Sequence, residues 1–251
     1  MTATLLGPDD PPPVEIVNEA SDYPVVLVCE HAGRVIPRSL GSLGLHAPHL
    51  DDHIALDIGA GHLSRLLAER LGTTTVLQRY SRLVIDCNRP LDAPDSVPEI
   101  SDQVTVPGNR GLTDDQRRAR IEAIFMPFDR TVGAVLDRGH GKAAFSIHSF
   151  TPVFGGVVRP WDVSFLSRRD SVTSKVLARN VGRRNGDLVI GFDQPYQIED
   201  ESDWFIPQHA ETRDLPHSLI EVRNNHLRSD EDIAAWASIL ADAIGSFAET
   251  L

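Results

Sequence analysis

Short, continuously apolar runs separated by longer amphipathic segments constrain the fold of this chain more than any other feature. Residues 24–30, 142–148 and 218–222 are such runs. A run of this kind is typical of a strand buried on both faces, as in a parallel sheet covered by helices. By contrast, residues 52–71 carry apolar side chains at mostly helical spacing, and Gly72 fits a helix C-terminal cap. The chain is therefore predicted to be an α/β protein.

The remaining elements continue this alternation. Further strands are predicted at residues 73–77, 83–87 and 187–191, further helices at 113–138, 171–184 and 230–248, and a surface loop at 91–111. Alternating strands and helices predict a three-layer α/β/α fold with a mixed, mostly parallel central sheet. The 251 residues show no internal repeat and suit one domain at 14–251, after a flexible N-terminal arm at 1–13 that ends in three prolines.

The charge of the chain disfavours polyanionic partners. Asp and Glu number 36 against 24 Lys and Arg, so the formal net charge is −12. Such a surface repels nucleic acid and anionic lipid within a Debye length of about 8–10 Å. We therefore expect no nucleic-acid or membrane partner, and an anionic substrate would need a local arginine cluster. The sequence leaves the oligomeric state open.

The cysteines and the N-terminal sequence predict a cytoplasmic location. Cys29 and Cys87 both lie in apolar runs, where buried thiols in a reducing compartment are expected. The first residues lack the basic and apolar regions of a signal peptide, and no apolar stretch approaches 18 residues.

Two histidines stand at the ends of predicted strands. His31 follows the run 24–30, and His148 ends the run 142–148. The carboxyl ends of parallel strands meet at one sheet edge, where ligands bind in such folds. Catalytic zinc sites commonly use two His and one carboxylate and leave a position open for water. Either residue could instead be an ordinary hydrogen-bonded His, because no His-Glu-x-x-His or Cys-x-x-Cys motif accompanies them.

Charged groups at the same predicted edge suggest catalysis on an anion. Glu221 lies in an apolar strand, where an ionised carboxylate needs a partner or a role. It could be a general base beside a metal-activated water, or form a structural salt bridge to Arg223. Arg82 and Arg89 flank the run 83–87; arginines grip carboxylates with two hydrogen bonds, although ordinary surface pairs are the alternative.

Several sequence blocks, taken together, resemble the N-formylglutamate amidohydrolase family. These blocks occur in family order and are Cys29–Pro37, His53–Ala60, Tyr80–Arg89, His148–Thr151 and Ile220–Asn225. The family is similar in fold to zinc carboxypeptidases and aspartoacylases, which implies the zinc-exopeptidase type of α/β/α fold.

The resemblance implies a role for several residues. His31 and His148 would be zinc ligands, Asn88 and Arg89 would bind a substrate carboxylate, Arg82 would polarise the scissile carbonyl, and Glu221 would be the general base. The carboxypeptidase-like enzymes place a ligating Glu three residues after the first His, but this chain has Arg34 there. We expect Asp57 to be the third ligand, with Asp52 and Glu30 as alternatives. Tyr196 and His209 lie in segments similar to those that line the family's substrate pocket.

The expected function is a metal-dependent hydrolase that cleaves the amide bond of N-formyl-L-glutamate, a step of histidine breakdown, or of a similar N-acyl amino acid. The expected cofactor is Zn²⁺, although other divalent ions accept the same ligands. Its partner would be a small carboxylate-bearing N-acyl substrate. A carboxypeptidase-like or aspartoacylase-like deacylase is the related alternative. The second alternative is a catalytically inactive protein of the same fold that binds small anions without a metal.

Overall fold

The computed structural model describes residues 4–251 and is built around a seven-stranded sheet. The strand order is β1-β3-β2-β6-β11-β9-β10. The strands are β1 (Val14–Val17), β2 (Val25–Cys29), β3 (Thr75–Gln78), β6 (Ala143–Phe150), β9 (Val163–Leu166), β10 (Ile190–Phe192) and β11 (His217–Arg223). Strand β1 runs antiparallel to β3, and β9 runs antiparallel to β11, whereas the other four pairings are parallel. The predicted mixed, mostly parallel sheet is confirmed.

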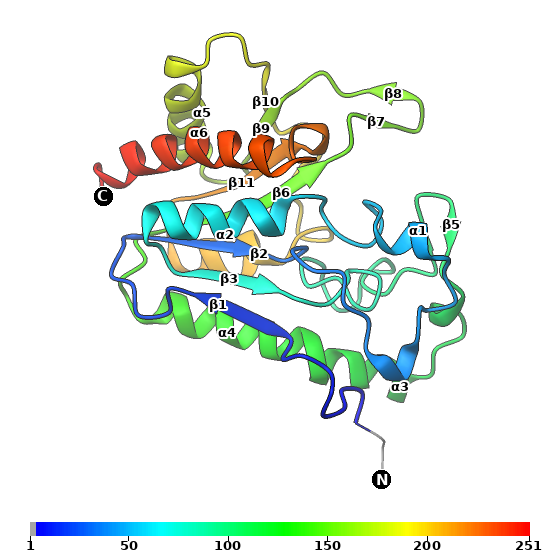
Figure 1. Cartoon of the computed structure of the whole chain (residues 1–251). Coiled ribbons are helices and arrows are strands. Elements are labelled where there is room, and N and C mark those ends of the chain that lie inside the picture. Colours follow the sequence, from blue (N-terminus) through cyan, green and yellow to red (C-terminus); the bar gives the residue numbers. More distant parts are fainter. Residues whose placement is uncertain (1–3) are drawn as a thin grey trace.

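Helices cover both faces of this sheet (Figure 1). The helices α2 (Ala60–Leu71), α5 (Ser171–Arg184) and α6 (Asp230–Ala248) pack on one face, and α4 (Met126–Asp137) lies on the other. Both ends of α5 and of α6 agree with the predictions. The continuous apolar run of β2 follows from this layering, because Val25 and Leu27 face the first set of helices while Val26 and Val28 face α4.

The predicted helix at 113–138 exists as one continuous helical segment. It begins with α3 (Asp114–Arg120), passes through a π-helical turn, η3 (Ile121–Phe125), and ends with α4. Thr113 starts it with a capping box, since its hydroxyl accepts from Gln116 N–H and the Gln116 side chain accepts from Thr113 N–H.

Short elements connect the main ones. They are the helix α1 (Ala47–Leu50), the strand pairs β4 (Ile100–Ser101) with β5 (Val104–Thr105) and β7 (Val153–Phe154) with β8 (Val157–Val158), and the turns η1 (Arg38–Leu40), η2 (Pro107–Asn109), η4 (Ile206–Ala210), η5 (Glu211–Arg213) and η6 (Asn224–His226).

The predicted strand at 83–87 is wrong, because this apolar run is a buried loop. Side chains from elsewhere in the chain, instead of a neighbouring strand, satisfy two of its carbonyls. Asn109 donates to the Leu83 carbonyl at 2.8 Å, and Arg120 donates to the Val84 carbonyl at 2.9 Å. Buried backbone requires such partners, and a sequence pattern does not reveal them.

The predicted helix at 52–71 begins later than expected. Residues 52–59 form turns, and α2 starts only at Ala60, after Gly59 with a φ of 79°. This left-handed conformation favours glycine and interrupts the helical path. The turn leaves Asp57 outside the helix, where its N–H donates to the His31 carbonyl at 3.1 Å.

Two other predicted segments are more closely packed than their composition indicated. The predicted surface loop at 91–111 contains β4, β5 and η2 and buries Val97, Val106 and Asn109. Of the predicted arm at 1–13, residues 1–3 lie outside the described residues. Leu5 and Leu6 pack against the core on the α4 side. The arm's flexibility stays a prediction.

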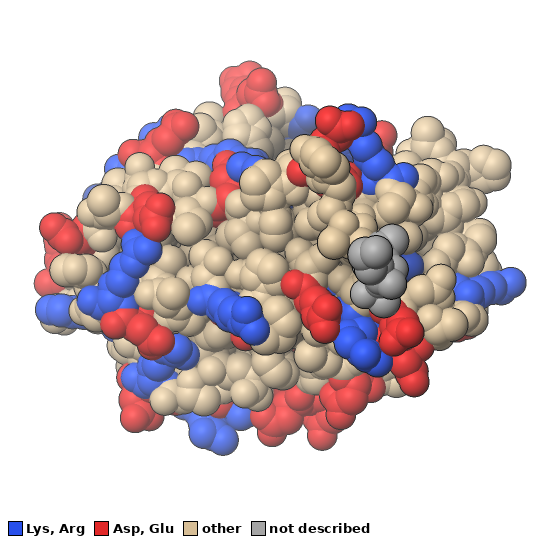
Figure 2. All heavy atoms as spheres, turned by 90° about the horizontal axis from the view of Figure 1, so that it is seen from below, with Lys and Arg blue, Asp and Glu red and all other residues tan. Residues whose placement is uncertain are grey.

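The surface carries charges of both signs. Figure 2 shows Lys and Arg interspersed with Asp and Glu on the face seen from below, with uncharged areas between them. Among the helices of residues 4–251, none is both long enough and apolar enough to cross a membrane.

Candidate active site and metal centre

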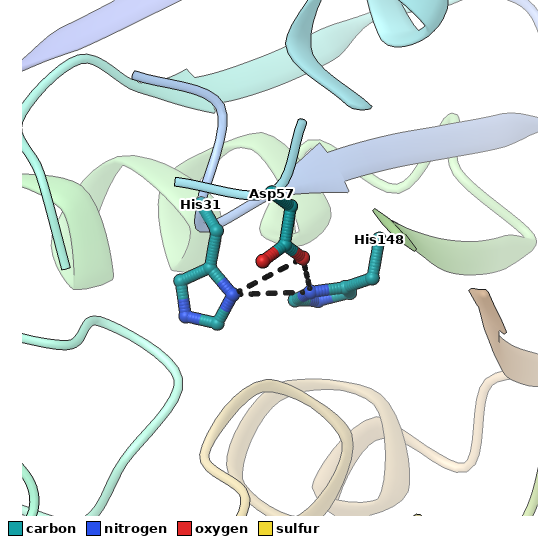
Figure 3. A group of neighbouring side chains, drawn as sticks. All are labelled: His31, Asp57 and His148. Carbon is teal, nitrogen blue, oxygen red and sulfur yellow. Dashed lines mark hydrogen bonds and ion pairs between the residues drawn. The ribbon is translucent and has the colours of Figure 1, made fainter. Parts of the chain in front are cut away.

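Three side chains from distant parts of the sequence converge at the carboxyl ends of the central strands. Figure 3 shows His31, Asp57 and His148 pointing toward one another. The His31 Nδ1 atom lies 3.2 Å from His148 Nδ1 and 3.4 Å from Asp57 Oδ2, and His148 Nδ1 lies 2.8 Å from Asp57 Oδ2. All three residues are buried. The structure thus brings together the two predicted histidines and Asp57.

The fold places each of the three residues for a local reason. His31 follows the end of β2, and His148 belongs to β6, which pairs in parallel with β2. Asp57 reaches the same point from the turn before α2, and its Oδ2 accepts a hydrogen bond from Ser149 N–H at 3.3 Å. The late start of α2 therefore delivers the carboxylate to the two imidazoles.

A second layer of carboxylates surrounds the imidazoles. His31 Nε2 donates to Asp86 Oδ1 at 2.7 Å, which leaves Nδ1 free to face the centre of the cluster. His148 Nε2 lies 3.0 Å from Glu30 Oε2, at an angle outside hydrogen-bonding geometry. Ser146 donates to the same Glu30 oxygen at 2.6 Å. Carboxylates on the outer nitrogens of histidines are typical of metal centres, because they fix the tautomer and the ring orientation.

Arg82 connects this second layer to the cluster. Its Nη2 and Nε donate to Asp86 Oδ2 at 2.8 and 3.1 Å, and its Nη1 donates to Asp57 Oδ1 at 3.2 Å. Burial opposes the charged form of Arg82, but the two carboxylates outweigh it and raise the guanidinium pKa. Arg82 thus holds both acids in place.

The buried charges of the cluster call for a cation. Glu30, Asp57 and Asp86 carry three negative charges, and Arg82 compensates one of them. Burial opposes ionisation of Asp57, but its histidine neighbours outweigh burial and hold its pKa well below the usual value. Burial acts against a charged His148, yet Asp57 and Glu30 raise its pKa well above the usual value. If a metal ion replaces the proton on His148, both imidazoles are neutral, and two negative charges remain for the divalent ion to balance.

The spacing of the donor atoms also fits a metal ion. Metal–nitrogen and metal–oxygen bonds of about 2.0–2.1 Å in a tetrahedral arrangement keep ligand atoms roughly 3.3–3.4 Å apart. The two contacts of His31 Nδ1 match this spacing, while the contact between His148 and Asp57 is somewhat shorter. Two imidazoles and one carboxylate suit zinc and other divalent transition metals.

A cavity of about 230 Å³ opens beside the cluster. Its lining consists of His31, Asp57, Arg82, Asn88, Arg89, His148, Ser149, Leu166, Tyr196, Gln197, Ile198, Ser202, Asp203, Leu219 and Glu221. Of the nine site residues predicted from the sequence, only His209 is absent from this lining.

Glu221 is the strongest candidate for acid–base chemistry in this cavity. It stands beside His148 in the parallel register of β11 and β6. Burial raises its pKa to about 7, although the nearby His148, His31 and Arg82 oppose this shift. Its Oε2 is buried and has no hydrogen-bond partner among residues 4–251. A carboxyl group with these properties can exchange a proton near neutral pH. It does not form the alternative salt bridge to Arg223, which pairs with Asp162 instead.

Asn88 and Arg89 line the cavity and also hold one of its walls. The Asn88 Oδ1 accepts from the N–H groups of Trp204 and Phe205 at 3.1 and 3.0 Å, and its Nδ2 donates to Asp203 at 3.1 Å. Arg89 donates to Asp95 and to the Ser202 carbonyl. Its Nη2 has no acceptor in the part of the chain that is described, so this atom is available to a ligand.

His209 does not reach the cavity. It lies in η4, where its Nε2 is 2.8 Å from Asp129 and its ring stacks on Phe205. The prediction that it lines the pocket does not agree with this position, because the Asp129 carboxylate on α4 holds the imidazole against that helix. Tyr196, the other residue of this prediction, does line the cavity.

The two alternatives for the third ligand lie elsewhere. Asp52 is near the surface and pairs with His53, and Glu30 faces the outer nitrogen of His148. Sequence reasoning assigned no role to Asp86, although it stands inside the block Tyr80–Arg89, in an apolar run where a carboxylate needs a partner. It also missed Asp203, whose pKa is raised by burial, and no sequence pattern marks that residue.

The chain is similar to known proteins in both sequence and fold. A family model described as N-formylglutamate amidohydrolase matches residues 23–227. The crystal structure of gene product Atu2144 from Agrobacterium tumefaciens is similar over 98% of both chains, with 34% identity and a TM-score of 0.92. N-formylglutamate amidohydrolase from Ralstonia eutropha JMP134 has the same fold over 96% of this chain and 98% of its own, with 17% identity and a TM-score of 0.67. No curated protein matches the chain by sequence.

Proposed function

Because the chain belongs to the N-formylglutamate amidohydrolase family, we propose that it uses a divalent metal ion, zinc first, to hydrolyse N-formyl-L-glutamate or a similar N-acyl amino acid. One observation carries this proposal. Two imidazoles and a carboxylate converge at metal-binding distances beside an unpartnered buried Glu221, in a cavity that two arginines line.

The metal ion and Glu221 would divide the chemistry between them. A divalent ion held by His31, Asp57 and His148 supplies Lewis acidity towards the scissile carbonyl and the attacking water. Glu221 in its ionised form accepts the proton of the attacking water at Oε2, the atom without a partner. The same carboxyl group then delivers that proton to the leaving nitrogen of the amide.

The arginines would orient the substrate. Arg89 binds the α-carboxylate through its free Nη2, and Asn88 keeps the wall around Asp203 and Trp204 in place. Arg82 lines the same cavity and stabilises the negative charge that develops on the carbonyl oxygen, while it fixes Asp57 and Asp86. Orientation of this kind accelerates the reaction by lowering its entropic cost.

The proposed setting is the cytoplasm, where such a substrate would be a small metabolite of histidine breakdown. Both cysteines are buried and free, which suits a reducing compartment. The proposed partners are small molecules only, since the net charge of −12 disfavours nucleic acid and anionic membranes.

Elemental analysis followed by a hydrolysis assay tests the proposal. We expect about one divalent ion per chain in the purified protein, and release of formate from N-formyl-L-glutamate that a chelator abolishes and added metal restores. A parallel panel of N-acetyl amino acids and dipeptides separates a deformylase from a deacylase or a carboxypeptidase. A protein that binds no metal and hydrolyses none of these compounds would instead be the small-anion binding module.

A further inference from the structure

Arg159 is a buried cation without an anion. Its side chain belongs to a residue that is only 8% exposed, and no carboxylate of residues 4–251 lies within ion-pair distance of it. A guanidinium stays charged even when buried, so its burial without a counter-ion is unfavourable. Arg120, which is also buried and unpaired, differs because two of its nitrogens donate to two carbonyls and an amide oxygen. Within residues 4–251, the Arg159 side chain donates through Nη1 alone, and its acceptors are two neutral hydroxyls.

The position of this guanidinium is next to the cavity. Its Nη1 donates to Thr151 Oγ1 and to Tyr196 Oη, each at 3.1 Å, and Tyr196 is a lining residue. The guanidinium carbon lies 5.0 Å from the centre of the Tyr196 ring and 4.8 Å from that of Phe154. Two aromatic contacts and two hydroxyls orient the group without neutralising it.

The backbone of Arg159 is tied to the strand that carries Glu221. Arg223, two residues after Glu221 on β11, donates to the carbonyls of Arg159 and Pro160 at 3.2 and 3.0 Å. The hairpin of β7 and β8 turns at Gly155 and Gly156, both with positive φ, and so returns the chain with Phe154 against the guanidinium. Arg159 is therefore held at a fixed place relative to the proposed base.

The Tyr196 hydroxyl adds a second donor. Its oxygen accepts from Arg159, so its own proton is available, and it has no acceptor among the described residues. The free Nε and Nη2 of Arg159 and the phenol proton would together suit the two oxygens of a carboxylate.

We propose that Arg159 and Tyr196 form a second anion-binding position at the edge of the cavity, which takes the side-chain carboxylate of a dicarboxylic N-acyl amino acid. Arg89 would take the α-carboxylate of the same molecule. This inference rests on the proposed function and deepens it, because it assigns the residues that select an acidic side chain over a neutral one of the same size.

Calorimetric binding of L-glutamate and L-glutamine to the purified metal-containing protein tests this position without requiring turnover. A hydrogen bond to a charged group changes affinity by roughly tenfold or more, so we expect the wild-type protein to bind glutamate at least about tenfold more tightly than glutamine. The Arg159→Gln variant should lose that preference while its affinity for glutamine stays within about threefold. The exposed Arg118, on α3, provides a matched control, and Arg118→Gln should keep the preference.

A second variant keeps the inference testable if Arg159→Gln fails to fold. Tyr196→Phe removes only one hydroxyl from a half-exposed residue and should weaken glutamate binding several-fold more than glutamine binding. Equal binding of the two ligands by the wild-type protein overturns the inference, and so does an equal loss of both in Arg159→Gln.

The same proteins assayed with N-formyl-L-glutamate and N-formyl-L-glutamine separate the two proposals. Turnover of both substrates at similar kcat/KM keeps the hydrolase and overturns the acidic position. Binding selectivity that depends on Arg159, without turnover of either compound, keeps the position and overturns the proposed reaction.

Discussion

At the scale of single residues, the surroundings of Glu221 determine what its carboxyl group can do. Burial raises its pKa to about 7, and its Oε2 has no partner in the described chain. Glu221→Gln preserves the shape but removes proton transfer, so we expect kcat to fall by about 10²–10⁴ while the metal content is unchanged. Steady-state kinetics and elemental analysis of the same sample check this. Undiminished turnover in the variant would rule out the role of base.

Asp86 would influence metal binding indirectly, through its hydrogen bond with His31, and this effect can be measured. It accepts the Nε2 proton of His31, so Asp86→Asn should weaken metal binding by about 10–100-fold. Competition with a chromogenic chelator measures the affinity. Asp102→Asn is a matched control, because Asp102 pairs with the outer nitrogen of His53 near the surface. If both variants bind metal as tightly as the wild-type protein, the hydrogen bond between His31 and Asp86 does not contribute to metal affinity.

The sequence revealed side chains that stand at strand ends, but not those that act through another residue. His31, His148 and Glu221 were visible because each interrupts or ends an apolar run. The partners Asp86 and Glu30 gain their roles only from contacts 55 and 118 residues away, respectively, in the chain. The apolar run around Asp86 indicates that its carboxylate needs a partner, but no local pattern identifies a partner at such distances.

At the scale of elements, α6 offers a test of local sequence signals. Its N-cap Ser229 accepts a hydrogen bond from Asp232 N–H at 3.1 Å. Ser229→Ala should lower the free energy of unfolding by about 0.5–2 kcal/mol. It should not change kcat, because Glu221 and His148 point to the α4 side of the sheet, whereas α6 covers the opposite side. Urea unfolding measures the change. Ser229→Asp, which keeps a cap, should stay close to the wild-type protein.

The ion pair that links β1 to α2, between Glu15 and Arg65, should stabilise the fold less at low pH. Two hydrogen bonds from Arg65, both 2.8 Å, lower the pKa of Glu15 below its usual value. A lowered folded-state pKa means that this contact stabilises the protein above the unfolded pKa and is lost as pH falls through the folded one. Glu15→Gln should therefore reduce stability at pH 7 and have a smaller effect at about pH 2. A destabilisation of equal size at both pH values would contradict this linkage.

Helices with a sustained apolar period were predictable from sequence, whereas some short strands and irregular segments were not. Helices α5 and α6 match their predicted limits because their apolar periodicity extends over several turns. The four-residue strands β1 and β9 were not predicted, because so few residues carry little pattern, although β3, of equal length, overlaps the strand predicted at 73–77. The apolar run 83–87 resembles a strand in sequence, but Asn109 and Arg120 satisfy its backbone instead. Tertiary contacts outweighed local preference at these places.

At the scale of the whole molecule, a bound metal should stabilise the fold. Its proposed ligands come from the end of β2, the turn before α2 and strand β6, so only the folded chain presents all three. At a free metal concentration of 100 times the dissociation constant, the gain is about 2.7 kcal/mol, or roughly 5–10 °C in Tm. Scanning calorimetry with and without chelator measures it. In the His31→Ala/His148→Ala variant the chelator should have no effect.

The pairing of β6 with β11 has a further consequence. In the observed register Glu221 lies beside His148, and both side chains point to the α4 side of the sheet. Sliding β11 by one position would swing the carboxyl group to the opposite side, among Phe145, Ile147 and the helices that cover them. The carboxyl group that would perform the chemistry thus also disfavours the wrong strand register. A chain with β11 shifted by one position would lack the base in the site and would bury a carboxyl group among apolar side chains, so it would be both inactive and unstable.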